Sequence, residues 1–133
     1  MTLSKILLAC FCALMLAACA TNPSDSKSFK NYSAKQLLES GEKSMTKRNY
    51  RDAIKYFEAI DSLYPFDHEA RQGQLDIIYT YYKTDDYASA LAAADRYIHL
   101  YPTGKHTDYA HYMKGVINFE KDRTWLQRLH ARQ

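Results

Sequence analysis

The sequence predicts an all-α protein built from stacked helical hairpins, and three observations lead to that prediction. The body of the chain repeats with a period of 37 residues, which separates Tyr50 from Tyr87 and Pro65 from Pro102. A period of this size is typical of solenoids, in which each repeat is one supersecondary unit. Apolar residues recur within the repeats at helical spacing. Only four glycines and three prolines occur in 133 residues, which argues against a loop-rich or all-β fold.

Residues 1–18 are predicted to be a lipoprotein signal peptide. Lys5 provides a short basic start, residues 6–16 form an apolar run, and small residues lead to Cys19. This layout is that of a secretory signal, and the run is shorter than the roughly 20 residues of a membrane-spanning helix. It resembles the lipobox of bacterial lipoproteins, so Cys19 is the expected lipidation site. The alternative is an ordinary signal in which Cys19 is incidental.

Residues 19–31 are expected to form a lipidated, flexible tether, because they are polar and lack periodicity. Acyl chains on Cys19 would hold the protein on a membrane surface, with its body in water. Ala20, not an acidic residue, follows Cys19. By resemblance to enteric bacterial lipoproteins, this favours the outer membrane, facing the periplasm. The balance of 18 basic and 15 acidic side chains gives no case for a nucleic-acid partner.

The first helix of each repeat is predicted by one apolar face. Ser33 and Gln36 form a capping-box pattern before the first of these helices. The three faces align in the same register, so that stacking would bury them in a continuous core. They consist of Leu37, Leu38, Gly41 and Met45, then Leu75, Ile78, Tyr79 and Tyr82, then Tyr109, Tyr112, Met113 and Val116.

The second helix of each repeat is predicted between an acidic start and a proline stop. Asp52 and Asp86 lie where a carboxylate can accept backbone N–H bonds. Pro65 and Pro102 end the hairpins, because proline disfavours helix for the residue before it. The apolar stripes are Ala53, Ile54, Phe57 and Ile60 in one repeat, and Ala90, Leu91, Ala94, Tyr97 and Ile98 in the next.

The repeat pattern fades in the third unit, where Gln127 stands in place of an alanine. We therefore assign residues 32–121 to the repeat domain, with two full repeats and part of a third. Residues 122–133 are open to two interpretations. Either the chain is a fragment truncated here, or this segment is an imperfect cap with Trp125 and Leu126 turned inward.

The hairpins resemble the tetratricopeptide repeat. Gly41, Ala53, Phe57 and Pro65 stand at the signature spacing of that motif. The period exceeds the usual 34 residues, which predicts longer connections. In such solenoids the first helix of each pair lines the concave face.

Three stretches resemble the BamD (ComL) family of outer-membrane assembly lipoproteins: residues 53–61 with 64–66, residues 74–83 and residues 108–115. The run Tyr-Pro-Phe, followed by Ile-Tyr-Thr-Tyr-Tyr-Lys, is the most specific part. The resemblance implies a periplasmic solenoid that helps unfolded β-barrel proteins insert into the outer membrane. It also implies that amino-terminal repeats bind the barrel substrate and that carboxy-terminal repeats dock on BamA, the chief partner in the Bam complex. This chain is expected to keep the first part and to lack most of the second.

The candidate binding residues form two groups. An aromatic trough on the first helices would offer rings and hydroxyls to an extended peptide, with a lysine for its terminal carboxylate. The alternative is that these tyrosines pack between repeats. The second group consists of Arg51, Tyr64 and Phe66, at the first turn and at the exit of the first hairpin's second helix. The family resemblance implies that this group contacts the substrate. The alternative is that these residues are a helix-start charge and a hydrophobic plug. The trough comprises Leu75, Tyr79, Tyr82, Lys83, Tyr109 and Tyr112, with Val116 and Phe119 beyond them.

The sequence does not predict an enzyme. His106 and His111 are five residues apart, a spacing that does not place both on one helical face as metal ligands. No Ser/His/Asp or Cys/His set is evident, and the only expected cofactor is the covalent lipid. We therefore expect a non-enzymatic component of β-barrel assembly. The alternative is another periplasmic repeat lipoprotein, acting as an adaptor in pilus assembly or cell-envelope division.

Overall fold

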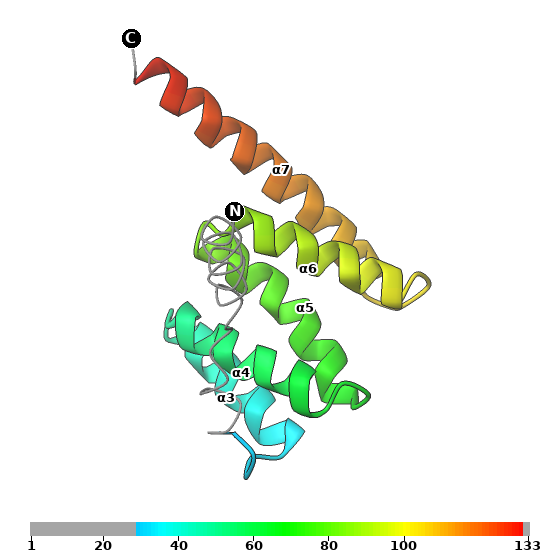
Figure 1. Cartoon of the computed structure of the whole chain (residues 1–133). Coiled ribbons are helices and arrows are strands. Elements are labelled where there is room, and N and C mark those ends of the chain that lie inside the picture. The colour runs from blue at the N-terminus through cyan, green and yellow to red at the C-terminus, as the bar shows by residue number, and fades with distance from the viewer. Residues whose placement is uncertain (1–28, 132–133) are drawn as a thin grey trace, which may run out of the picture.

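The computed structural model describes residues 29–131, and these form one stack of helices. The helices are α3 (Ala34–Thr46), α4 (Tyr50–Leu63), α5 (His68–Lys83), α6 (Tyr87–Leu100) and α7 (Thr107–His130). Each packs on the one before it, and α5 also contacts both α3 and α7 (Figure 1). The prediction of an all-α fold is confirmed. The signal peptide and Cys19 lie outside the described residues.

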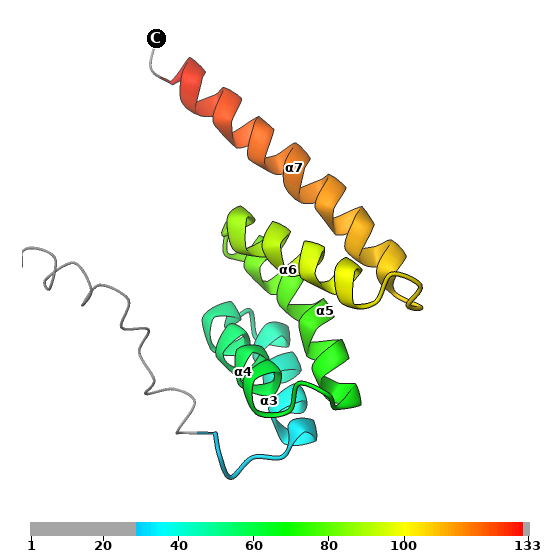
Figure 2. The ribbon, with the colours of Figure 1, turned by 45° about the vertical axis from the view of Figure 1, so that its right-hand side comes forward.

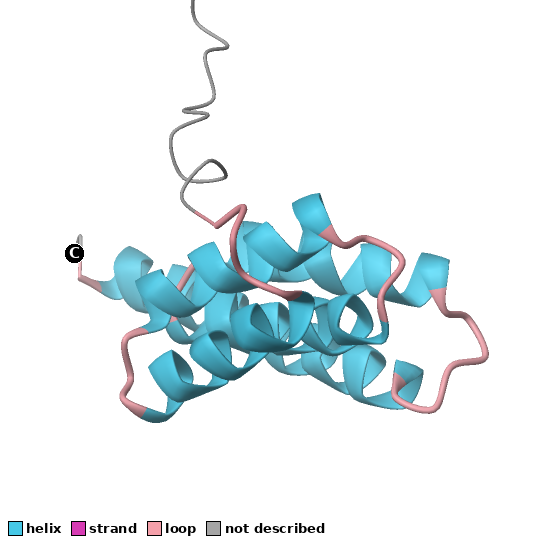
Figure 3. Ribbon diagram, turned by 90° about the horizontal axis from the view of Figure 1, so that it is seen from below, coloured by secondary structure: helices cyan, strands magenta, loops and turns pink. Residues whose placement is uncertain are grey.

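The repeat is visible in the backbone as well as in the sequence. Helices α4 and α6 each span 14 residues, and their first residues stand 37 positions apart. Arg48 and Asp85, also one period apart, both have a φ of 59° in the turns inside the hairpins. The same left-handed turn is therefore built twice without glycine. Viewed along another axis, the connecting loops gather at the two ends of the helices (Figure 3).

The predicted helix boundaries have the expected physical causes. At the start of α3, Gln36 N donates to Ser33 Oγ at 3.2 Å and Ser33 N donates to Gln36 Oε1 at 2.9 Å, a complete capping box. Asp86 Oδ1 accepts from Ser89 N at 3.1 Å and caps α6. Asp52 instead accepts from the Asn49 side chain, so it is not a backbone cap of α4. Helices α4 and α6 end two residues before their prolines.

The core falls into two buried clusters, one shared by α3, α4 and α5 and the other by α5, α6 and α7. The first half centres on Phe57, which is 1% exposed and packs with Leu37, Ile60 and Ile77. Gly41 is required beneath this ring, because a Cβ added there would lie 2.8 Å from Phe57 Cζ. The second half contains Ile78, Ala90, Ala94, Tyr97, Ala110, Met113 and Ile117.

The packed body begins earlier than the predicted start at residue 32. Phe29, assigned to the tether, lies against α4 with its ring centroid 5.2 Å from that of Tyr56. The Tyr64 hydroxyl donates to the carbonyl oxygen of Tyr32 at 2.6 Å and holds the same segment. An aromatic ring buries a large apolar area when a surface is in reach. The end of the predicted tether is therefore part of the fold.

Helix α7 differs most from the prediction. It continues through residue 122 as one helix of 24 residues, and its carboxy-terminal half projects beyond the stack (Figures 1 and 2). Trp125 and Leu126 are 58% and 48% exposed, so the alternative in which they turn inward as a cap is wrong. Helix α7 continues through these residues because no glycine or proline follows Gly115 in the sequence to end it. No helix in the part of the chain described here is long and apolar enough to cross a membrane.

Candidate functional site

Tyrosines from two first helices of the repeats form the principal candidate site. Helices α5 and α7 run in the same direction (Figure 1). The Tyr79 and Tyr82 rings lie 6.4 Å apart at a tilt of 46°, and both are half-buried. Lys83 is exposed in the last turn of α5, and Tyr109 is half-buried in the first turn of α7. We call Tyr79, Tyr82, Lys83 and Tyr109 the tyrosine surface.

A partly buried carboxylate lies beside this surface. Asp76 Oδ1 accepts a hydrogen bond from Gln72 Nε2 at 2.9 Å. Burial raises the pKa of Asp76 to about 6, and the nearby Glu42 charge acts in the same direction while the Gln72 bond opposes it. Burial also raises the pKa of Tyr109, with smaller contributions from Asp76 and neighbouring tyrosines. Asp76 and Tyr79 also line a groove with Glu42, Met45, Thr46, Tyr50 and Gln72.

This arrangement suits binding better than chemistry. The ring faces offer apolar area, and the hydroxyls can bond peptide groups at their edges. Sequence reasoning did not find Asp76 or Gln72. Their spacing of four residues on a helix that carries the tyrosines was a usable signal, because such residues share a face.

Replacing Asp76 by asparagine should stabilise the protein at pH 7. The rise in pKa from 3.8 to about 6 corresponds to at most roughly 3 kcal/mol, at about 1.4 kcal/mol per pKa unit. The folded state holds this proton more tightly than the unfolded state. The contribution of Asp76 to the wild-type free energy of unfolding is therefore fully present below pH 3.8 and is lost as the pH rises to about 6.

Denaturant unfolding of both proteins between pH 3.5 and 7.5 measures this difference. The asparagine can still accept the bond from Gln72, so the packing around it is preserved. The variant should gain stability over the wild type as the pH rises. A constant difference across this range would contradict the account of Asp76.

Two residues of the predicted trough differ from the tyrosine surface in exposure. Leu75 is 7% exposed and lies in the core with Ala110 and Met113 of α7. It is therefore not available to a ligand, and its assignment as a binding residue is wrong. Tyr112 occupies the equivalent position one repeat later and is 65% exposed. The face of α5 that α7 buries is thus the face that Tyr112 presents on α7.

The structure does not bring Arg51 together with Tyr64 and Phe66. Arg51 lies in the first turn of α4, and Tyr64 follows its last residue. At a rise of about 1.5 Å per residue, the helix separates them by roughly 20 Å. Phe66 is 98% exposed and does not plug the hairpin. The Tyr64 hydroxyl donates to the carbonyl oxygen of Tyr32, so in this structure it holds the segment before α3.

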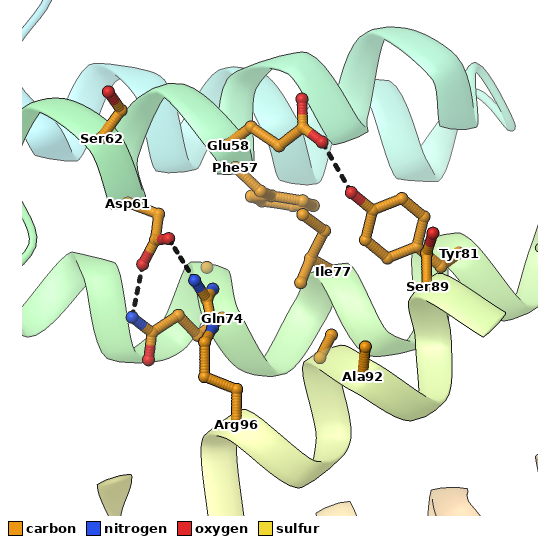
Figure 4. Close-up of a pocket in the computed structure, with 12 residues that line it drawn as sticks. Phe57, Glu58, Asp61, Ser62, Gln74, Ile77, Tyr81, Ser89, Ala92 and Arg96 are labelled. Carbon is orange, nitrogen blue, oxygen red and sulfur yellow. Dashed lines mark hydrogen bonds and ion pairs between the residues drawn. The ribbon is translucent and has the colours of Figure 1, made fainter. Parts of the chain in front are cut away.

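A second cleft, of about 390 Å³, lies between α4, α5 and α6 (Figure 4). Asp61 links all three helices, because its two carboxylate oxygens accept from Gln74 Nε2 and from an Arg96 guanidinium nitrogen, each at 2.6 Å. At the other end, the Tyr81 hydroxyl donates to Glu58 Oε1 at 2.6 Å. Burial, followed by this bond to a carboxylate, raises the pKa of Tyr81. Sequence analysis did not predict this network.

Comparison with known proteins supports the same family as the sequence motifs do. A family model described as YfiO, outer membrane lipoprotein, matches residues 30–132. The chain belongs to the BamD (YfiO) family. Its predicted family resemblance is thereby confirmed.

Several BamD relatives carry the name outer membrane protein assembly factor. The one from Neisseria gonorrhoeae is 36% identical over 130 residues, which cover 96% of this chain and 49% of the relative. The one from Vibrio cholerae is 38% identical over 94 residues, covering 71% and 39%. The one from Pasteurella multocida is 33% identical over 117 residues, covering 88% and 44%. The chain spans about half the length of these BamD relatives.

Proposed function

We propose that this chain acts as a non-enzymatic lipoprotein component of the outer-membrane β-barrel assembly machinery. In this role its helical stack binds segments of unfolded barrel proteins from the periplasmic side. Membership of the BamD family supports the role, and so do the names of relatives aligned over nearly all of this chain. The single observation that carries the proposal is the tyrosine surface, a half-buried aromatic patch with an exposed lysine at its edge.

The chemistry of the tyrosine surface favours a particular ligand. The paired rings of Tyr79 and Tyr82 suit an aromatic side chain, since aromatic pairs are stabilised at separations of about 4.5–7 Å. Lys83 can pair with a carboxylate, and its place in the last turn of α5 leaves its ammonium group in solvent. A peptide that ends in an aromatic residue carries both groups side by side. We therefore infer that the carboxy-terminal segment of a barrel protein is the preferred ligand.

The proposed membrane attachment is the lipid on Cys19, at the inner leaflet of the outer membrane. An alignment covering 96% of this chain has to include the region of Cys19, which supports a shared export segment. The proposed protein partners are other Bam complex subunits, chiefly BamA. No covalent chemistry is assigned to the tyrosine surface in this role.

Replacing both Tyr79 and Tyr82 by alanine should weaken the binding of a peptide that ends in phenylalanine at least tenfold. A tenfold change in affinity corresponds to about 1.4 kcal/mol of binding free energy. This is a modest loss for the removal of two aromatic contacts from an interface. Fluorescence anisotropy of a labelled peptide with the purified protein measures it. Replacing both residues by phenylalanine instead keeps the rings and should retain most of the binding.

Leu100→Ala is the control, because it truncates a side chain that is 50% exposed at the end of α6 and is not part of the tyrosine surface. Circular dichroism of each variant establishes that it is folded. An affinity unchanged by the double alanine variant would remove the tyrosine surface as the ligand site.

A further inference from the structure

The groove beside the tyrosine surface carries two carboxylates and no basic side chain. It has a volume of about 330 Å³ and is formed entirely by residues of α3, α4 and α5. Glu42 reaches it from α3 and Asp76 from α5, and Tyr79 belongs both to the groove and to the tyrosine surface. The remaining lining residues are Met45, Thr46, Tyr50 and Gln72. The groove is therefore acidic, and its other side chains are aromatic or neutral.

The Asp76 carboxylate lacks the basic partner that a comparable carboxylate of the stack has. Asp61 of α4 pairs with Arg96 of α6 at 2.6 Å. Within residues 29–131, neither Asp76 nor Glu42 is part of an ion pair. The amide of Gln72 gives Asp76 a hydrogen bond but no positive charge. A partly buried carboxylate without a counter-charge is costly and attracts a cation.

Asp76 faces acidic or aromatic side chains from the helices around it. Burial raises its pKa, and the charge of Glu42 on α3 raises it further. Burial of Tyr109 on α7 and then the charge of Asp76 raise the pKa of that tyrosine, so Asp76 also lies near α7. Tyr50 of α4 and Tyr79 of α5 line the groove with aromatic rings. These surroundings favour a cation over a neutral or acidic group.

We propose that this groove receives a lysine or arginine side chain of the barrel segment that binds the tyrosine surface. This role of the groove rests on the proposed function, because Tyr79 is shared by the two surfaces. The cationic head lies between the carboxylates of Asp76 and Glu42, where it makes charge-assisted hydrogen bonds. The alkyl stem lies along Met45 and the Tyr79 ring, which adds apolar contact and attraction between the cation and the aromatic face.

The spacing along α5 sets the position of the basic residue in the ligand. Asp76 lies seven residues before Lys83, a separation of about 10 Å along the helix axis. An extended peptide advances about 3.3 Å per residue, so about three residues cover the same length. With its terminal carboxylate at Lys83, the ligand places the residue three positions before its last opposite Asp76. The preferred segment has a basic residue at that position and an aromatic residue at its end.

Two labelled peptides that differ at that position test the proposal. Both end in phenylalanine; one has lysine three positions before the end, and the other has norleucine, which keeps the stem and lacks the charge. Fluorescence anisotropy with the processed protein in mild detergent should give at least about fivefold higher affinity for the lysine peptide at pH 7.5, as expected for a well-formed, partly exposed ion pair.

Asp76→Asn should reduce this preference for lysine to less than about twofold, because it removes the charge that faces the cation. The variant should stay folded, since the asparagine keeps the bond to Gln72. Glu42→Gln should also lower the preference. Glu39→Gln is the matched control, because it removes a carboxylate from the same helix that pairs with Lys35 and lies outside the groove, and it should leave the preference unchanged.

The preference for lysine should also decline as the pH is lowered from 7.5 to 5. Asp76, whose pKa burial raises to about 6, is mostly protonated at the lower pH and then no longer attracts the cation. A bound ammonium group favours the charged carboxylate, so binding of the lysine peptide releases protons near pH 6. In Asp76→Asn the ratio of the two affinities should not change over this pH range.

Three results would overturn the proposal. The first is equal affinity of the wild type for both peptides; the proposed function would survive it if alanine at Tyr79 and Tyr82 still weakened both. The second is a preference for lysine that persists in Asp76→Asn or is lost equally in Glu39→Gln, which would place the cation elsewhere or reduce its effect to net charge. The third is binding of neither peptide, which would remove the proposed function together with the role of the groove.

Discussion

Replacing Phe57 by alanine is expected to lower the free energy of unfolding by about 3–5 kcal/mol, the range typical of deleting a buried aromatic ring. The ring is 1% exposed and touches helices on both sides. The positions where Gly41 and Gly73 would carry a Cβ both lie against it. The variant loses the burial of the ring and leaves a cavity between α3, α4 and α5. Urea unfolding followed by helical circular dichroism measures the loss.

Two glycine variants provide a matched test of the same packing. Gly41→Ala should destabilise by about 1–3 kcal/mol, because its methyl group meets the Phe57 ring in a filled core. Gly115→Ala should stabilise by about 0.5–1 kcal/mol, because alanine is the better helix former and the site is open. Gly41→Ala should also become harmless once Phe57 is alanine. Equal effects of the two glycine variants would contradict the packing described for the first hairpin.

Replacing Cys19 by alanine is expected to abolish lipid attachment and release the protein from the membrane. Each buried methylene of an acyl chain contributes about 0.8 kcal/mol, so two or more chains make the anchor lasting. Labelling of cells with radioactive palmitate and fractionation of their membranes measure both effects. The helical stack should be unaffected, because Cys19 precedes the described helices, which begin at Ala34.

The control for the Cys19 variant is Cys12→Ala, a change inside the predicted signal peptide that should leave labelling intact. Palmitate incorporation into the Cys19 variant at the wild-type level would contradict the assignment. Loss of labelling in both variants would instead indicate a general export defect.

The helices of the first two hairpins could be predicted from the sequence because their causes are local. The capping box of Ser33 and Gln36 starts α3, and the prolines at 65 and 102 end α4 and α6. Because the pattern recurs every 37 residues, a helix boundary in one repeat predicts the equivalent boundary in the next. The continuation of α7 past residue 121 could not be predicted from the repeat, because the repeat pattern fades there. Helix formation needs only favourable residues and no breaker, and both conditions hold there.

The candidate site was predicted only in part, because exposure depends on neighbours that the sequence does not place. Leu75 and Tyr112 share a repeat position, yet α7 buries the first and no described helix covers the second. The network of Asp61, Gln74 and Arg96 joins residues from three helices, separated by 13 and 35 positions in the sequence. Only the stacking of the hairpins brings them into contact. Tyr79 and Tyr82 could be predicted to lie together because their spacing of three residues places them on one side of α5.

The central functional claim is that the tyrosine surface receives unfolded barrel proteins. A photo-crosslinking amino acid placed at Tyr79 tests it in living cells, with the same group at Ala92 as the control. Ala92 lies in the separate cleft between α4, α5 and α6 (Figure 4). We predict that the probe at position 79 captures newly exported β-barrel proteins and that the probe at position 92 does not. Equal capture at both positions, or capture at 92 alone, would contradict the claim.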